Sequence, residues 1–348
     1  MDLFFIEFRD PLFSIIIFFA LIFVITFFSY WWGRYKRTQD SRHLDRFLRQ
    51  FKTLPSKDEL QVLISSGELS EKSWLLLANS YYKNAEYEKS IEIYNEILNV
   101  GTLKNAKETM FLLGKTYFKA GFLERSKQVF LEILKRTPRT PQALHYLLLI
   151  YEYMRDYKSA LDLLEPLDEL GEDIRLERAY LESLIVINDP KTEPKVKLEK
   201  LLLIYKENHT LSYLIFEYLF RVDPKVAWEN LDLTKVELLT ELFWNCDTKD
   251  LNLDIISQSS FLQELYSARG DYSLSKKSDV FEFDLLIKLE SKANATLGFE
   301  YICSNCKSVS PFAYSRCSVC HALDTAQVEW SLIRDYRKDF SEENNSFQ

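Results

Sequence analysis

Four cysteines near the C-terminal end of the sequence have the types and spacing of metal ligands. They form two Cys-x-x-Cys pairs with ten residues between the pairs, and their positions are Cys303, Cys306, Cys317 and Cys320. Each pair can sit on a tight turn that points two thiolates toward one centre. Two such turns supply the tetrahedral set of sulfur ligands that suits Zn²⁺ and also suits iron. The pattern therefore predicts one bound metal ion, with zinc expected and iron as the alternative.

The ligand set favours a structural role for this metal. All four coordination positions would be taken by cysteines, so none stays open for water or a substrate. A segment of about thirty residues also needs such a metal in order to fold. Because the fourth position is filled, we expect His321, next to Cys320, to lie outside the ligand set. Disulfides or free thiols are the alternative, which a reducing compartment disfavours.

The remaining sequence offers no recognisable catalytic chemistry. It lacks the His-Glu-x-x-His, Gly-x-Ser-x-Gly and Gly-x-Gly-x-x-Gly patterns, and Thr109 stands where a phosphate-binding loop ending in "LLGKT" would need glycine. The fifth cysteine, Cys246, has no nucleophile signature around it and is expected to be a packed thiol. The net charge of −8 disfavours nucleic acid as a partner. We predict that the chain is not an enzyme and binds no nucleic acid.

The N-terminal region predicts a membrane anchor. Residues 11–32, "PLFSIIIFFALIFVITFFSYWW", carry no charge. As a helix they would span roughly 33 Å, against about 30 Å of bilayer hydrocarbon. Acidic residues precede this run and bulky aromatic residues close it, unlike a cleaved signal peptide. The excess of basic residues that follows places the rest of the chain in the cytoplasm, and these residues are Arg34, Lys36, Arg37, Arg42, Arg46 and Arg49.

Three segments between the anchor and the cysteines share one layout. They cover residues 73–98, 109–134 and 143–167, and equivalent positions lie 36 and then 34 residues apart. One column of equivalent residues holds Ala78, Gly114 and Leu148, and a later column holds Ser90, Ser126 and Ala160. Small residues in these columns let two antiparallel helices approach closely. The spacing and residue types resemble the tetratricopeptide repeat, and they predict an all-α, right-handed solenoid of helical hairpins.

The segmentation of the whole chain follows from these features. Beyond residue 170 the equivalent small residues are no longer found. Apolar residues at helical spacing continue, however, and they indicate degenerate repeats. We predict a non-cytoplasmic segment at 1–10, a transmembrane helix at 11–33, a juxtamembrane helical linker at 34–70, three clear repeats at 71–170, degenerate repeats at 171–267, a linker at 268–298, the metal ribbon at 299–330 and a tail at 331–348.

The order of these parts resembles the lipopolysaccharide assembly protein B (LapB) family. The similarity is clearest in "YICSNC" with "RCSVC", which resembles a rubredoxin-like ribbon, and in the membrane exit "YWWGRYKRTQ". The resemblance assigns the metal ligands to the same four cysteines. This sequence differs from the family at Lys307, where the family usually has a glycine that favours a left-handed turn.

The resemblance implies an adaptor in the bacterial inner membrane. Members of the family help the membrane protease FtsH to degrade the deacetylase that commits cells to lipid A synthesis, which regulates lipopolysaccharide synthesis. The expected partners are therefore these two proteins and the membrane. Tetratricopeptide repeats specify only that proteins are bound, so a scaffold for another envelope machine, in secretion or flagellar assembly, is the alternative. A redox or nucleic-acid-binding ribbon protein is a third interpretation.

Overall fold

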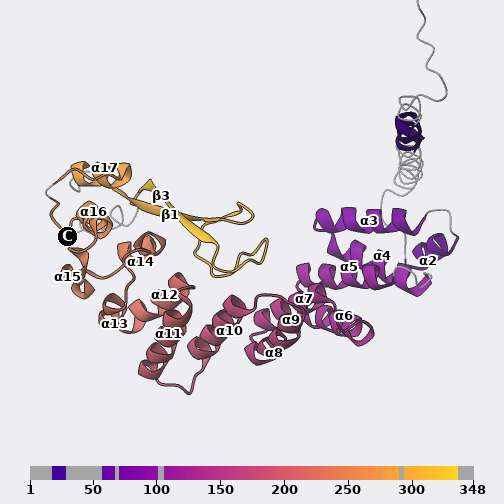
Figure 1. Ribbon diagram of the computed structural model, residues 1–348, viewed down its shortest axis with the longest axis horizontal. Helices are drawn as coiled ribbons and strands as arrows, with labels where there is room; N and C mark the ends of the chain where they lie inside the picture. The colour runs from indigo at the N-terminus through magenta and orange to yellow at the C-terminus, as the bar shows by residue number, and fades with distance from the viewer. Residues whose placement is uncertain are drawn as a thin grey trace, which may run out of the picture. The chain divides into compact units, whose positions relative to one another are not determined.

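The computed structural model describes residues 18–28, 57–66, 70–100, 106–274, 276–289 and 294–335 (Figure 1). The chain divides into two compact units, Met1–Arg155 and Asp156–Gln348. Helical hairpins make up most of the described residues, and one three-stranded sheet lies near the C-terminal end. The predicted fold, tetratricopeptide-type helical hairpins followed by a small four-cysteine ribbon, is confirmed.

About half of the predicted transmembrane helix, residues 11–17 and 29–33, lies outside the described residues. Within it, residues 18–28 are helical, and large apolar side chains such as Phe23 and Phe28 are exposed. Among the helices that the structure describes, none is both long enough and apolar enough to cross a bilayer. The predicted segment 1–10, most of the juxtamembrane linker and residues 336–348 of the tail also lie outside the described residues.

Among the described residues between 57 and 155, a short helix comes before five helices of successive hairpins. Three of the five are the first helix of a hairpin and two are the second. Neighbouring helices of this series contact one another, as α3, α4 and α5 do in Figure 1. The elements are α2 (Lys57–Ser65), α3 (Glu71–Lys83), α4 (Tyr87–Val100), α5 (Ala106–Lys119), α6 (Leu123–Arg136) and α7 (Pro141–Tyr153).

The turn that ends each first helix has the same backbone conformation. Ala85, Gly121 and Arg155 occupy equivalent positions after α3, α5 and α7, and their φ angles are 61°, 82° and 59°. After α3 and α5 the amide three residues beyond the helix donates to a carbonyl five residues earlier, as in Phe122 N–H to Tyr117 O at 2.9 Å. A left-handed residue at this point satisfies the free carbonyls at a helix end. The hairpins therefore share a turn geometry, although only one of the three residues is glycine.

The columns of small residues are explained by the contact between α5 and α6. The Ser126 hydroxyl donates to the Gly114 carbonyl at 2.8 Å, and a Cβ added to Gly114 would lie 2.9 Å from the Phe130 ring. Phe130 is fully buried and stacks on Tyr146 of α7 with 5.1 Å between ring centroids. Glycine at position 114 thus makes room for the aromatic side chain that joins consecutive hairpins.

The second unit begins with an interrupted helix. Pro166 lacks the amide hydrogen that would bond to Asp162, and its ring clashes with that carbonyl. The helix accordingly breaks at Leu163 into α8 (Tyr157–Asp162) and α9 (Leu164–Glu169). The later helices are α10 (Arg175–Asn188), α11 (Pro194–Asn208), α12 (Ser212–Val222), α13 (Pro224–Glu229), η1 (Val236–Leu239), α14 (Thr240–Trp244), η2 (Thr248–Asp250), α15 (Leu253–Ile256), α16 (Ser260–Arg269) and α17 (Phe281–Leu289).

The sheet supports the cysteine region. Its strands are β1 (Ala295–Cys303), β2 (Val309–Ser310) and β3 (Ala326–Arg334), in the order β2-β1-β3 with antiparallel pairing. The register pairs Cys303 with Ala326, so β1 ends where the first cysteine must begin its turn. On β3, Trp330 packs against Phe261 of α16 and Phe283 of α17, with 5.8 Å between ring centroids in both pairs. The strands thus fix one end of the metal ribbon to the last helices.

Candidate metal centre

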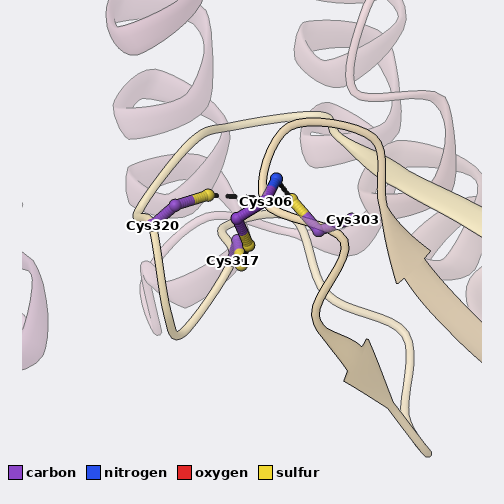
Figure 2. Close-up of side chains that lie close together, drawn as sticks. All are labelled: Cys303, Cys306, Cys317 and Cys320. Carbon is purple, nitrogen blue, oxygen red and sulfur yellow. Dashed lines mark hydrogen bonds between the residues drawn. The ribbon is translucent and has the colours of Figure 1, made fainter.

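The structure brings the four predicted cysteines together at the tips of two loops (Figure 2). Their Sγ atoms all lie within 4.8 Å of one another. The Sγ atoms of Cys303 and Cys320 are 3.6 Å apart, and those of Cys306 and Cys317 are 3.7 Å apart. A tetrahedral zinc site with Zn–S bonds of about 2.3 Å has sulfurs about 3.8 Å apart. The donor set therefore fits one four-coordinate metal ion.

The two loops repeat the same backbone pattern. The Lys307 amide donates to the Cys303 carbonyl, and the His321 amide donates to the Cys317 carbonyl, each at 2.9 Å. Lys307 and His321 both have a φ of 62°, which lies in the left-handed region. A residue with a Cβ adopts this conformation at a cost of about 1–2 kcal/mol. Both turns follow the second cysteine of a pair, so the chain uses a left-handed residue there without glycine.

Polar groups surround the sulfurs. The Cys306 amide donates to Cys303 Sγ at 3.5 Å, and the Thr325 hydroxyl lies 3.3 Å from the same sulfur. The Ser308 hydroxyl lies 3.1 Å from Cys306 Sγ and 3.4 Å from Cys317 Sγ. Burial opposes ionisation of Cys303, but these hydrogen bonds, led by that of the Cys306 amide, lower the pKa of its thiol. The surroundings of Cys303 thus favour the thiolate that a metal requires.

An ion pair fastens the second cysteine loop to α10. Arg316 forms two hydrogen bonds to the Glu177 carboxylate, at 3.0 and 2.7 Å, and its side chain is only 6% exposed. The guanidinium also lies 5.1 Å from the centroid of the Tyr180 ring and donates to the His321 carbonyl at 2.9 Å. Two parallel hydrogen bonds fix both position and orientation. Arg316 therefore joins the metal loop to a helix 139 residues earlier in the chain.

Two further contacts attach the ribbon to later helices. The Asp324 carboxylate accepts a hydrogen bond from the Leu211 amide, at the start of α12, at 3.0 Å. The Glu241 carboxylate on α14 accepts hydrogen bonds from Tyr301 of β1 and from Tyr213 of α12, the latter at 3.1 Å. The ribbon is thus bonded to helices from three separate parts of the second unit.

The sequence motifs located the ligands but not these contacts. Arg316 is one of two basic residues between positions 299 and 330, and Glu177 and Glu241 belong to no motif. No local pattern marks them, because each partner lies far away in the sequence. Cys246 lies outside the four-cysteine group, and burial raises the pKa of its thiol to about 11. His321 contributes no atom to that group.

No protein-family model matches the chain, and no curated protein matches it.

Several solved structures are similar to the chain at low identity. MamA, residues 41 to the end, from Desulfovibrio magneticus RS-1 is 20% identical, and the match covers 55% of this chain and 98% of that one, with a TM-score of 0.35. A tetratricopeptide repeat protein from Parabacteroides merdae ATCC 43184 is 17% identical over 67% of this chain and 90% of that one, with a TM-score of 0.37. YrrB, described as a TPR protein with an unusual peptide-binding site, is 15% identical over 52% and 91%, with a TM-score of 0.35.

Proposed function

We propose that this chain is a membrane-anchored adaptor whose helical hairpins hold partner proteins. Stacked hairpins present extended surfaces that suit protein binding. By its resemblance to the LapB family, the partners are the lipid A deacetylase and the protease FtsH, and the outcome is control of lipopolysaccharide synthesis. The anchor lies in the bacterial inner membrane, and the hairpins and ribbon lie in the cytoplasm.

The docking of the ribbon onto the helices is the observation that carries this proposal. Four cysteines would fill every coordination position of the metal, so none would stay open for a substrate. Cys303 and Cys317 are buried, and Cys306 and Cys320 are half-buried. The nearby ion pair between Arg316 and Glu177 is also largely buried. Such contacts hold the ribbon as part of the helical body. The ribbon accordingly serves to shape the binding protein rather than to carry out a reaction.

The four cysteines would hold one zinc ion, with iron as the alternative. When bound, the metal supplies a crosslink between the loop of Cys303 and Cys306 and the loop of Cys317 and Cys320. The chain itself supplies the hydroxyls of Ser308 and Thr325, whose hydrogen bonds with Cys306 Sγ and Cys303 Sγ orient the sulfurs. An absorption spectrum separates the two metals, because iron thiolates are coloured and zinc thiolates are not.

Tethering explains how the adaptor would act. An anchored body meets membrane proteins at a raised effective concentration, so modest contacts with each partner suffice. Holding the deacetylase near a membrane protease would then set the rate of its degradation.

Depletion of the protein tests this function directly. We expect the deacetylase and lipopolysaccharide to accumulate, because the substrate is no longer delivered to the protease. Wild type and the matched variant Cys246→Ser should restore both levels, whereas the double variant Cys303→Ser/Cys320→Ser should not. An unchanged deacetylase level after depletion contradicts the proposal. Copurification of a secretion or flagellar complex with the intact, anchored protein would then favour the alternative scaffold.

A further inference from the structure

A small cavity lies between the ribbon and the helices that hold it. The first turn of α12, one residue of η1 and the strands and loops of the ribbon surround it, and its volume is about 190 Å³. Pockets for drug-sized ligands measure roughly 300–1,000 Å³, so this cavity suits a ligand of only a few non-hydrogen atoms. Most of the side chains that line it carry a hydroxyl, carboxylate or amide group. We call it the tyrosine cavity, after Tyr213, Tyr301 and Tyr314.

The tyrosine rings form part of the walls of this cavity. The rings of Tyr213 on α12 and Tyr301 on β1 meet at 81°, with 6.0 Å between their centroids, like two walls of a corner. Tyr314, in the segment between β2 and Cys317, adds a third ring to the lining. The faces of aromatic rings attract cations, because the ring quadrupole places negative potential there. Three rings around one small space therefore favour a cation over an anion.

The charged groups at the cavity are acidic. Asp324 lines it, and Glu241 lies beside it, since Glu241 accepts hydrogen bonds from the hydroxyls of both Tyr213 and Tyr301. Within the described part of the chain, no lysine, arginine or histidine lines the cavity. The start of α12 carries a partial positive charge, but Asp324 already meets it by accepting a hydrogen bond from the Leu211 amide at 3.0 Å. The cavity is therefore complementary to a positively charged ligand.

Hydroxyl oxygens in the cavity can accept hydrogen bonds from such a ligand. Because Tyr213 and Tyr301 donate their hydrogens to Glu241, lone pairs on their oxygens remain for a donor. The Tyr314 hydroxyl is buried, and among the described residues it forms no hydrogen bond of ordinary geometry. A primary ammonium offers three N–H donors, whereas a quaternary ammonium offers none. The polar groups thus match a primary ammonium.

We propose that the tyrosine cavity binds a small primary amine in its charged form. The ammonium group lies among the three tyrosine rings, with the Asp324 carboxylate as its counter-ion. This inference goes beyond the adaptor function, because it needs no partner protein. An amine held there contacts both the ribbon and α12, so its binding stabilises the attachment of the ribbon to that helix.

Saturation-transfer NMR with the metal-loaded full chain in detergent micelles tests the proposal. The probe is ethanolamine. The comparison ligands are choline, ethylene glycol and glycolate, in which a quaternary ammonium, a hydroxyl and a carboxylate replace the primary ammonium on the same two-carbon frame. We expect ethanolamine to bind more tightly than each of the three by a factor of about ten or more. Equal binding of any of the three, or no binding of ethanolamine, overturns the proposal.

Two charge-removing substitutions locate the site. Asp324→Asn keeps an oxygen that can accept the Leu211 amide but loses the charge, so it should weaken ethanolamine binding by a factor of about ten or more. Asp254→Asn is the matched control, because it removes an exposed carboxylate on α15, outside the cavity. It should leave the affinity within about twofold of wild type. Equal effects of the two substitutions contradict the proposal.

Tyr314→Phe keeps the test decisive if Asp324→Asn loosens the ribbon. It removes a hydroxyl that forms no hydrogen bond of ordinary geometry among the described residues and keeps the ring, so the metal content and the circular dichroism spectrum should stay unchanged. We expect ethanolamine binding to weaken by a factor of about three or more, since one acceptor of the ammonium is lost. Full affinity of Tyr314→Phe with its metal retained places the amine outside the cavity and overturns the proposal.

Discussion

Arg316 shows how much of the ribbon's attachment depends on a single side chain. It binds the Glu177 carboxylate through two hydrogen bonds, contacts the Tyr180 ring and donates to a carbonyl of the metal loop. Because the guanidinium is largely buried, its attraction to the carboxylate is weakly screened by solvent. Loss of either charge leaves the other desolvated and without its partner.

We expect Arg316→Gln to destabilise the ribbon by about 3 kcal/mol, the cost of breaking a buried pair by removing one partner. Urea titration of the metal-loaded protein measures this loss of stability. The readout is the release of metal to a chromogenic chelator. Glu177→Gln should cost a similar amount.

The double variant Arg316→Gln/Glu177→Gln is the control for this pair. It removes both charges, so it should be less destabilised than the sum of the single variants. Strict additivity would mean that the two side chains do not stabilise the ribbon through each other.

Cys246 gives a pH prediction. Burial raises the pKa of its thiol to about 11, so less thiolate exists at any pH below that value than for an ordinary cysteine. At pH 8 the alkylation rate of Cys246 should be roughly 100-fold lower than that of an unfolded peptide containing the same cysteine. The alkylation rate of Cys246 should also keep rising as the pH is raised beyond 9. Mass spectrometry of the metal-loaded protein after timed alkylation measures both rates. A rate that levels off near pH 9 would show an ordinary, solvated thiol.

The helical hairpins show which elements sequence patterns can specify. The columns at Gly114 and Ser126 indicated two closely approaching helices, and the structure places these residues in direct contact. The sequence did not predict the shared turn. Gly121 is a residue type that favours the left-handed conformation, but Ala85 and Arg155 adopt the same conformation without being glycine. Repeat geometry imposed by tertiary packing overrides the local preference of these two residues.

Gly114→Val should destabilise the protein by about 1–3 kcal/mol. The added side chain overlaps the Phe130 ring, which is fully buried and cannot move without disturbing Tyr146. Thermal unfolding monitored by circular dichroism measures the effect. Ser80→Val is the matched control, since it adds the same branched side chain to an exposed site on α3 and should change stability by less than about 0.5 kcal/mol. Equal effects of the two substitutions would contradict the close contact.

For the molecule as a whole, the sequence predicted the helical hairpins and the cysteine ribbon that follows them, but not how the ribbon is attached to the helices. Two Cys-x-x-Cys pairs predict four neighbouring sulfurs because short turns enforce their geometry locally. The bonds from Arg316, Asp324 and Tyr301 to the helices join residues separated by 60 to 139 positions. Contacts between residues so far apart produce no repeating pattern in a single sequence, so only the folded structure shows them. The ribbon that the sequence presents as a separate motif is bonded to the helical unit.

A metal bound by the four cysteines would crosslink the two loops and so hold the ribbon against the helices of the second unit. Hydrogen exchange of the full chain, with metal and after its verified removal by chelation, tests this most directly. We expect amide exchange to accelerate in residues 299–330 and in α10 and α12, because the loops that bond to these helices lose their crosslink, while exchange in α3 to α6 stays unchanged. Unchanged protection of the ribbon and of these two helices after complete loss of metal would contradict the account.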